Sequence, residues 1–156
     1  MHNNDDSQRF PFRKNPRMKG YDYSTPNYYF VTICTWQKQH LFGQAGNLNV
    51  YGELAKQGLQ EIESHFPSVK VEHFVVMPNH VHAILILQEQ NVSLSVVIGQ
   101  YKAYVTKAIR KYLPDYHVWQ SSFHDHVIRN QKSYEQIWLY IDANPINWEK
   151  DCFFTE

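Results

Sequence analysis

The stretch VVMPNHVHAILIL, residues 75–87, indicates how the centre of this protein is built. Pro78 and Asn79 are typical of a tight turn, and the residues on either side of them are apolar or β-branched. We therefore expect two neighbouring strands, 69–77 and 80–87, joined directly by this turn. Beyond its first residues the second strand is apolar at every position, which is typical of a central strand covered on both faces.

Two histidines, His80 and His82, stand at the beginning of that strand. Residues two apart in a strand point to the same face and lie about 6.6 Å apart along it, so both imidazoles can reach one metal ion. The alternative is a pair of histidines hydrogen-bonded at the rim of the sheet, because imidazoles are costly to bury without partners. The spacing alone leaves both interpretations open.

The remaining segments alternate between strand and helix patterns around this pair. Strands are predicted at 28–35, 69–77, 80–87 and 123–129, and helices at 50–66, 94–112 and 134–143, the last two capped by Ser93 and Ser133. This order, βαββαβ plus a C-terminal helix, predicts an α+β fold of the ferredoxin-like (RRM-like) type, an antiparallel sheet with helices on one face. We expect a basic N-terminal arm over 1–25, a single domain over 26–148 and a short C-terminal tail over 149–156.

Composition restricts the class of protein. The 156 residues are 43% hydrophobic and 19% charged, a balance found in ordinary globular domains. No apolar run approaches the roughly 20 residues of a membrane helix, and the N-terminus lacks the apolar core of a secretion signal. We therefore expect a cytoplasmic protein with no membrane partner, in which Cys34 and Cys152 are buried free thiols rather than a disulfide.

The formal net charge is zero, but the basic residues are unevenly distributed. Many of them lie in two segments without acidic residues, 9–19 and 99–113. The first contains Arg13, Lys14, Arg17 and Lys19, and the second contains Lys102, Lys107, Arg110 and Lys111. Tyrosines are interspersed in the second segment, at positions 101, 104 and 112. Such a mixture can bind phosphates while the rings stack on bases. It can equally be a solvated helix face whose tyrosines pack inward.

The last predicted helix carries a further set of polar side chains. Tyr140 and Asn144 are four residues apart, so they share one helical face, one turn from each other. The Asn144 amide oxygen can complete a site with His80 and His82, and such nitrogen and oxygen ligands with open positions suit Mg²⁺ or Mn²⁺ acting on a phosphoryl oxygen. Tyr140 is then a nucleophile beside that ion, or else an ordinary packed tyrosine.

A second His-x-His pair, His124 and His126, flanks Asp125 in the fourth predicted strand. The charged residue between the histidines indicates an edge strand with one solvated face. No neighbouring residue supplies an obvious third ligand, so we expect this pair to lie outside the metal site.

Taken together, these motifs resemble a known family. MPNHVHAIL, which contains the first histidine pair, matches the His-hydrophobe-His strand of the HUH single-strand nucleases. The run VWQSSFHDHVIRNQKSYEQIWLYIDANPINW resembles the REP-associated tyrosine transposases, a branch of the single-tyrosine transposases of small insertion sequences. RKNPRMKGYDYSTPNYYFVTICT resembles the start of those proteins, so the similarity is collinear from about Arg13 to Trp148.

This resemblance implies a function. It implies His80 and His82 as ligands of Mg²⁺ or Mn²⁺, Tyr140 as the nucleophile that attacks a DNA phosphate, and Asn144 as a third ligand where relatives often have glutamine. The implied reaction cleaves and rejoins single-stranded DNA near a hairpin through a covalent 5′-phosphotyrosine. The eight basic residues named above are the candidates for binding the hairpin phosphates.

Other interpretations stay open at this point. One alternative is a domesticated nucleic-acid-binding module with weak or no cleavage activity. Another is a metal-dependent hydrolase of small phosphoesters. Some relatives are homodimers whose tyrosine helix serves the partner's site, whereas others resemble monomers, and the sequence does not decide between them. A DNA substrate places the protein at the nucleoid.

Overall fold

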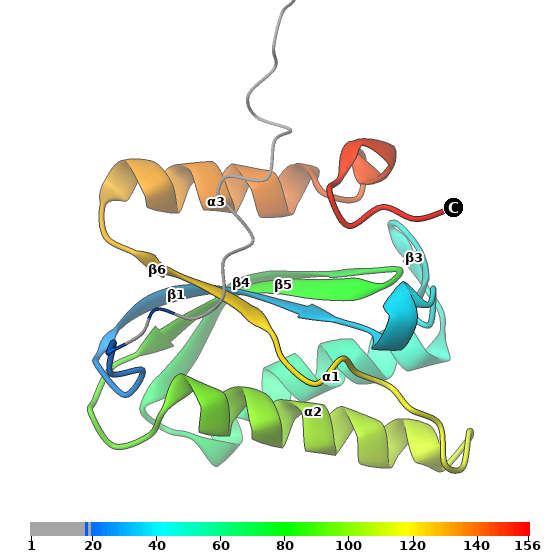
Figure 1. Ribbon diagram of the computed structural model, residues 1–156, viewed down its shortest axis with the longest axis horizontal. Coiled ribbons are helices and arrows are strands. Elements are labelled where there is room, and N and C mark those ends of the chain that lie inside the picture. The colour runs from blue at the N-terminus through cyan, green and yellow to red at the C-terminus, as the bar shows by residue number, and fades with distance from the viewer. Residues whose placement is uncertain (1–17, 19) are drawn as a thin grey trace, which may run out of the picture.

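A computed structural model describes residue 18 and residues 20–156 of the chain. Its centre is a four-stranded antiparallel sheet in the order β4-β5-β1-β6 (Figure 1). The strands are β1 Asn27–Cys34, β4 Val69–Met77, β5 His80–Leu87 and β6 His124–Ile128. The predicted α+β ferredoxin-like fold is confirmed, and the two strands joined at Pro78-Asn79 have the predicted bounds.

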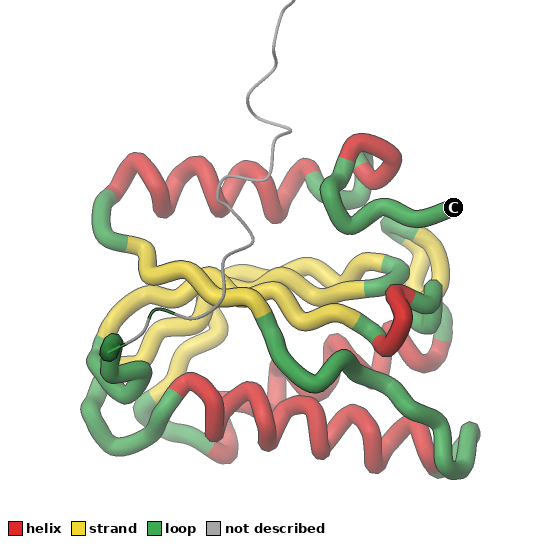
Figure 2. Tube along the Cα trace, in the orientation of Figure 1, coloured by secondary structure: helices red, strands yellow, loops and turns green. Residues whose placement is uncertain are grey.

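Helices cover both faces of this sheet. α1 (Val50–His65) and α2 (Leu94–Arg110) lie side by side on one face, whereas α3 (Gln131–Ala143) crosses the other (Figures 1 and 2). Two short 3-10 helices, η2 (Trp36–Lys38) and η3 (Trp148–Lys150), follow β1 and α3, and a small hairpin of β2 (Gly43–Gln44) and β3 (Asn47–Leu48) precedes α1. All eight residues of β5 are buried, as expected for a central strand.

The helix ends follow ordinary capping chemistry, with one difference from prediction. Ser93 caps α2 by accepting a hydrogen bond from the Val96 amide, as predicted. α3 begins earlier than expected, because the side chain of Asn130 accepts a hydrogen bond from the Ser133 amide. Asn130, and not Ser133, is therefore the N-cap.

The two faces of the sheet have different cores. The larger lies between the sheet and the α1–α2 pair, where a Cβ on Gly58 would come within 2.8 Å of Val105, so the glycine permits close helix packing. Tyr101 packs into this core, and its hydroxyl donates to the Ala55 carbonyl at 2.9 Å. This tyrosine therefore packs inward, as in the alternative to base stacking given for the second basic segment. The smaller core, under α3, consists of Phe30, Ile84, Ile128, Ile137, Tyr140 and Ile141.

The chain ends in a segment that packs back onto the sheet. Phe153 is 1% exposed, and Asp151 is also buried. Cys34 and Cys152 are not joined in a disulfide, as predicted, but Cys152 is exposed, because its neighbours and not its own side chain turn inward. Among the described helices, none has the length and apolar character required to cross a membrane.

Candidate metal centre and tyrosine nucleophile

His80 and His82 lie at the start of β5 and face α3. Cys34 and Thr32 of β1 stand opposite them in the sheet, so the pair occupies the middle of the four-stranded layer. Both imidazoles are completely buried. Neither histidine is a rim residue, so their polar atoms need partners inside the protein.

Both histidines have one ring nitrogen engaged and the other directed at its neighbour. Nδ1 of His80 lies 2.7 Å from Oδ1 of Asn79, and Nδ1 of His82 lies 2.8 Å from the Thr32 hydroxyl. The two Nε2 atoms are 3.0 Å apart. Proton-bearing Nδ1 atoms that donate to these oxygens leave both Nε2 lone pairs for a cation, which is the usual arrangement of supported metal-binding histidines.

Asn79 is more than a turn residue. Its Nδ2 donates to the Phe153 carbonyl at 2.8 Å, which fixes Oδ1 as the atom that faces His80. Its own carbonyl accepts hydrogen bonds from the backbone amide and the hydroxyl of Thr35. The turn between the two strands therefore orients the first histidine, a role that its turn-forming character alone did not reveal.

Two buried oxygens stand as candidates for a third ligand. Oδ2 of Asp151 is 3.7 Å from Nε2 of His80, and the ligand atoms of His80, His82 and Asp151 all lie within 4.8 Å of one another. Asn144, the predicted third ligand, is 2% exposed at the end of α3. Among the residues that the structure describes, Oδ2 of Asp151 and Oδ1 of Asn144 are buried without a hydrogen-bond partner.

This donor set fits a divalent cation. Two nitrogens bound about 2.1 Å from one ion at a right angle are about 3 Å apart, close to the separation of the two Nε2 atoms. An orphaned carboxylate oxygen beside them supplies negative charge that otherwise costs free energy to bury. Sequence reasoning missed Asp151 because it lies in the segment expected to be a tail, 69 positions after His82, with no periodic signal to point to it.

Tyr140 comes from α3 and lies over the same site. Its ring centroid is 5.3 Å from that of His82 and 6.3 Å from that of Phe30, and it is 4% exposed. Burial raises the pKa of the phenol far above its usual value, and electrostatic interactions with Asp151 and Cys152 raise it further. A neutral phenol is a weak nucleophile, so the ring must lose its proton as it reacts.

Contacts between α3 and β4 hold the tyrosine helix in place. The Tyr134 hydroxyl donates to Glu72 at 3.0 Å, and Nε2 of His73 lies 2.6 Å from Oδ1 of Asp142. The His73 ring also stacks on Trp138, with centroids 4.0 Å apart. The helix is therefore fastened at several points to the strand next to β5 of the same chain.

Burial also affects the histidines. It lowers the pKa of His82 well below the ordinary value, and the nearby His80 and His124 add to this effect. A neutral imidazole is the form that binds metal. The environment of His82 therefore keeps it ready as a ligand at neutral pH.

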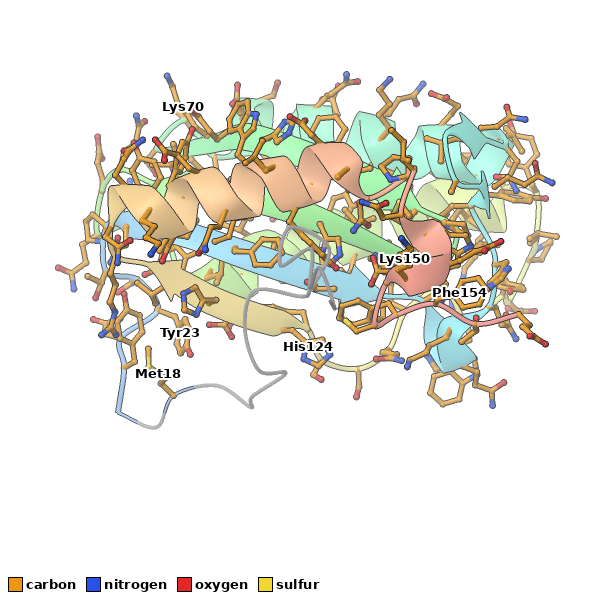
Figure 3. The ribbon with its side chains drawn as sticks, turned by 90° about the horizontal axis from the view of Figure 1, so that it is seen from above. Met18, Tyr23, Lys70, His124, Lys150 and Phe154 are labelled. Atoms are coloured by element: carbon orange, nitrogen blue, oxygen red, sulfur yellow. The ribbon has the colours of Figure 1, made fainter. Side chains whose placement is uncertain are left out.

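The second His-x-His pair is closer to this site than expected. Thr32 pairs with both His82 and His124, so His124 points to the same face of the sheet. Its ring is 5.9 Å from that of Phe153, and it stands along the outer edge of β6 (Figure 3). Among the described residues, the metal-capable group contains neither His124 nor His126, so their exclusion from the ligand set stays a prediction.

The predicted DNA-binding residues divide into two groups. Arg13, Lys14, Arg17 and Lys19 lie outside the described residues. The others line an open groove along α2, formed by Lys102, Ala103, Thr106, Lys107, Arg110 and Lys111. Because α2 and α3 cover opposite faces, this groove and the tyrosine are separated by the sheet (Figure 1). Lys102 itself donates to the carbonyls of Gln120 and Ser122.

Comparisons with known proteins give matches over most of the chain. The model of the family "Transposase IS200 like" matches residues 23–144. An uncharacterized protein of Haemophilus influenzae is 36% identical over 169 residues, covering 92% of this chain and 94% of that protein. Among solved structures, a REP-associated tyrosine transposase bound to a REP hairpin superposes with a TM-score of 0.67 at 22% identity, covering 87% of this chain and 74% of that one.

A second solved structure, a putative transposase from Deinococcus radiodurans R1, has a TM-score of 0.55 at 18% identity and covers 83% of this chain and 97% of that one. These likenesses to solved structures confirm the fold, and the family match covers most of the chain. The predicted resemblance to single-tyrosine transposases is thereby confirmed, together with a transposase-like role in DNA processing. The chain belongs to the IS200-like transposase family.

Proposed function

We propose that this protein is a hairpin-directed endonuclease and strand transferase for single-stranded DNA that works through a covalent 5′-phosphotyrosine. The observation that carries the proposal is the placement of Tyr140 beside the imidazole pair of its own chain, with ring centroids 5.3 Å apart at His82. A buried tyrosine used only for packing does not require two supported histidines and a carboxylate oxygen buried without a hydrogen-bond partner beside them.

The reaction follows from the residues present. The oxygen of Tyr140 attacks the scissile phosphorus, the bond from phosphorus to the 3′-oxygen breaks, and that oxygen leaves as a 3′-hydroxyl after it takes up a proton. The new tyrosine–phosphate bond conserves the phosphodiester, so a later attack by a 3′-hydroxyl rejoins strands without ATP. Both steps are transesterifications at one phosphorus.

His80 and His82 are proposed to hold Mg²⁺ or Mn²⁺, with an oxygen from Asp151 or from Asn144. A divalent cation held by these residues would stabilise the charge that develops on the phosphate. Thr32 and Asn79 keep the imidazoles oriented, and the packed strand behind them keeps the pair from moving. Asn144 is one turn from Tyr140, and its hydrogen bonding lowers the pKa of the phenol against the larger effect of burial.

The substrate proposal is a DNA hairpin with a flanking single strand. The solved relative with the same fold is bound to a REP hairpin. In this chain the α2 groove presents Lys107, Arg110 and Lys111 without an acidic residue among its lining, and the N-terminal basic group adds four charges. Contacts of this kind make binding fall steeply with salt concentration.

One chain contains every proposed catalytic group. Since Tyr140 contacts His82 of the same chain and α3 is fastened to β4, we propose that the tyrosine acts in cis. A homodimer is not required for the chemistry.

An adduct assay tests the proposal. Hairpin DNA with random single-stranded flanks is labelled at its 3′ end, incubated with Mn²⁺ or Mg²⁺, and resolved under denaturing conditions. The label should migrate with the protein, because the tyrosine joins the 5′-phosphate of the downstream fragment. A 5′ label should instead appear in a shorter free strand.

Two variants on the same helix sharpen this test. Tyr140→Phe should abolish the adduct, whereas Tyr134→Phe, which removes only the hydroxyl that donates to Glu72, should retain it. An adduct that survives Tyr140→Phe overturns the proposed nucleophile. Binding without cleavage favours the nucleic-acid-binding alternative, and cleavage without an adduct favours a metal-dependent phosphoester hydrolase.

A further inference from the structure

An exposed pair of stacked rings stands at the end of β1. Trp36 lies on His117 with ring centroids 4.1 Å apart and planes 12° apart. The indole is 38% exposed although so large an aromatic side chain is usually well buried, and His117 is exposed as well. One indole face is therefore supported by the imidazole while much of the side chain stays open to solvent.

The backbone around this pair is held firmly. The Trp36 amide donates to the Val118 carbonyl at 2.9 Å, and the Gln120 amide donates to the Cys34 carbonyl at 3.0 Å. Gln37 and Lys38 both have a φ of 52°, which is the left-handed region that side chains other than glycine rarely adopt. A turn that accepts two such residues in succession is typical of a functional site.

The ring pair is anchored to the supports of the metal site. Cys34, two residues before Trp36, stands opposite His80, so the chain reaches Trp36 directly after it leaves the strand position beside the metal site. Thr35, between them, donates to the carbonyl of Asn79, the residue that orients His80. The turn that follows β1 lies at the same end of the sheet as the C-terminal segment (Figures 1 and 2).

A second route connects the same turn to the site. The ring of His40 contacts that of Trp148 at 5.7 Å, and Trp148 in turn contacts the ring of His80 at 5.9 Å. Lys38 stands two residues after the indole. The Tyr116 hydroxyl donates to the side chain of Gln39, which joins the turn to the segment that carries His117.

We infer that Trp36, backed by His117, is a stacking site for an unpaired base of single-stranded DNA next to the scissile phosphate. This inference rests on the proposed function, because it needs a single strand that passes the metal site. Every base has an aromatic face, so a rigid exposed indole binds it independently of sequence, and the Lys38 ammonium can neutralise an adjoining phosphate. The rigid turn holds the indole in place before the strand arrives, which lowers the entropic cost of stacking.

The test separates contact with bases from contact with phosphates. The full chain carrying Tyr140→Phe, which prevents cleavage, is titrated by fluorescence anisotropy with two probes. One is a single-stranded thymidine oligonucleotide, and the other is an abasic deoxyribose-phosphate strand of the same length. Trp36→Ala should weaken binding of the thymidine strand by about 5- to 150-fold and leave the abasic strand unchanged. Trp36→Phe should restore most of the affinity.

Tyr28→Ala is the matched control, because Tyr28 is an exposed aromatic residue (41%) at the opposite end of β1 from Trp36 and should leave both affinities unchanged. A 5-bromodeoxyuridine strand should form a photo-crosslink with the peptide that contains Trp36. The inference is overturned if Trp36→Ala, with an unaltered melting temperature, binds thymidine strands like its parent or loses both probes equally. If the wild-type chain still forms the Tyr140 adduct in that case, only this inference fails, whereas absence of adduct and of strand binding removes the proposed function with it.

Discussion

The two His-x-His pairs have the same spacing and face the same side of one sheet, yet their surroundings differ. His80 and His82 are fully buried, each has an oxygen at Nδ1, and a carboxylate lies beside them. His124 and His126 stand on the edge strand and are only partly buried. Spacing brings two imidazoles to one face, but burial and oriented partners make them a candidate metal clamp.

The largest expected effect is on adduct formation, when a histidine of the first pair is replaced and the result is compared with replacement of a histidine of the second pair. His82→Ala should lower the rate of adduct formation at least 100-fold and weaken Mn²⁺ binding, because it removes a proposed ligand and not merely a support. His124→Ala should change both by less than about threefold. The measurements are initial rates on the 3′-labelled hairpin and calorimetric titration with Mn²⁺, with melting curves as the check on folding. If His124→Ala lost more adduct formation and Mn²⁺ binding than His82→Ala, the metal ligands would have to be assigned to β6 and not to β5.

An intermediate effect should identify the oxygen ligand. Asp151→Asn keeps the shape of the side chain but removes its charge, so it should weaken Mn²⁺ binding about 10- to 100-fold if the carboxylate is the ligand. Asn144→Ala should then have the smaller effect on affinity. The reverse ranking would select Asn144 as the third ligand and leave Asp151 as a buried neighbour. Calorimetry on both variants decides between them.

The smallest effect concerns stability in the absence of metal. Burial lowers the pKa of His82 well below its value in the unfolded chain, near 6.5, so below that pH the unfolded state binds more protons. With EDTA present, the free energy of unfolding should therefore fall as pH decreases from about 6.5, by up to about 1.4 kcal/mol per pH unit, and be independent of this group above pH 7.

Comparison with the other pair supplies the control for this prediction. The pKa of His126 is also lowered, by burial and by Arg129, but this residue is partly solvated. Urea denaturation should show that His82→Asn removes more of the pH dependence than His126→Asn does. Equal slopes in the two variants would mean that the burial of His82 does not govern acid stability.

Much of the fold could be predicted because its signals are local. The turn at Pro78-Asn79 and the apolar runs on either side of it predicted the bounds of β4 and β5 to the residue, since strand pairing across a tight turn depends on neighbours in sequence. The helical spacing of Tyr140 and Asn144 likewise predicted that they share one face of the helix, and both are buried in the structure. The start of α3 was missed because Asn130 and Ser133 are both good caps, and only the backbone geometry selects one.

The sequence by itself determined the strand that carries His80 and His82, the helix that carries Tyr140, and the family to which both belong, because these depend on periodicity and on contiguous motifs. Only the tertiary structure decided that α3 covers the face opposite α1 and α2, that Asn79 orients His80, and that Asp151 returns to the histidines. These contacts join residues distant in the chain or depend on where a side chain points. They follow from the packing of one buried surface against another, which no local pattern encodes.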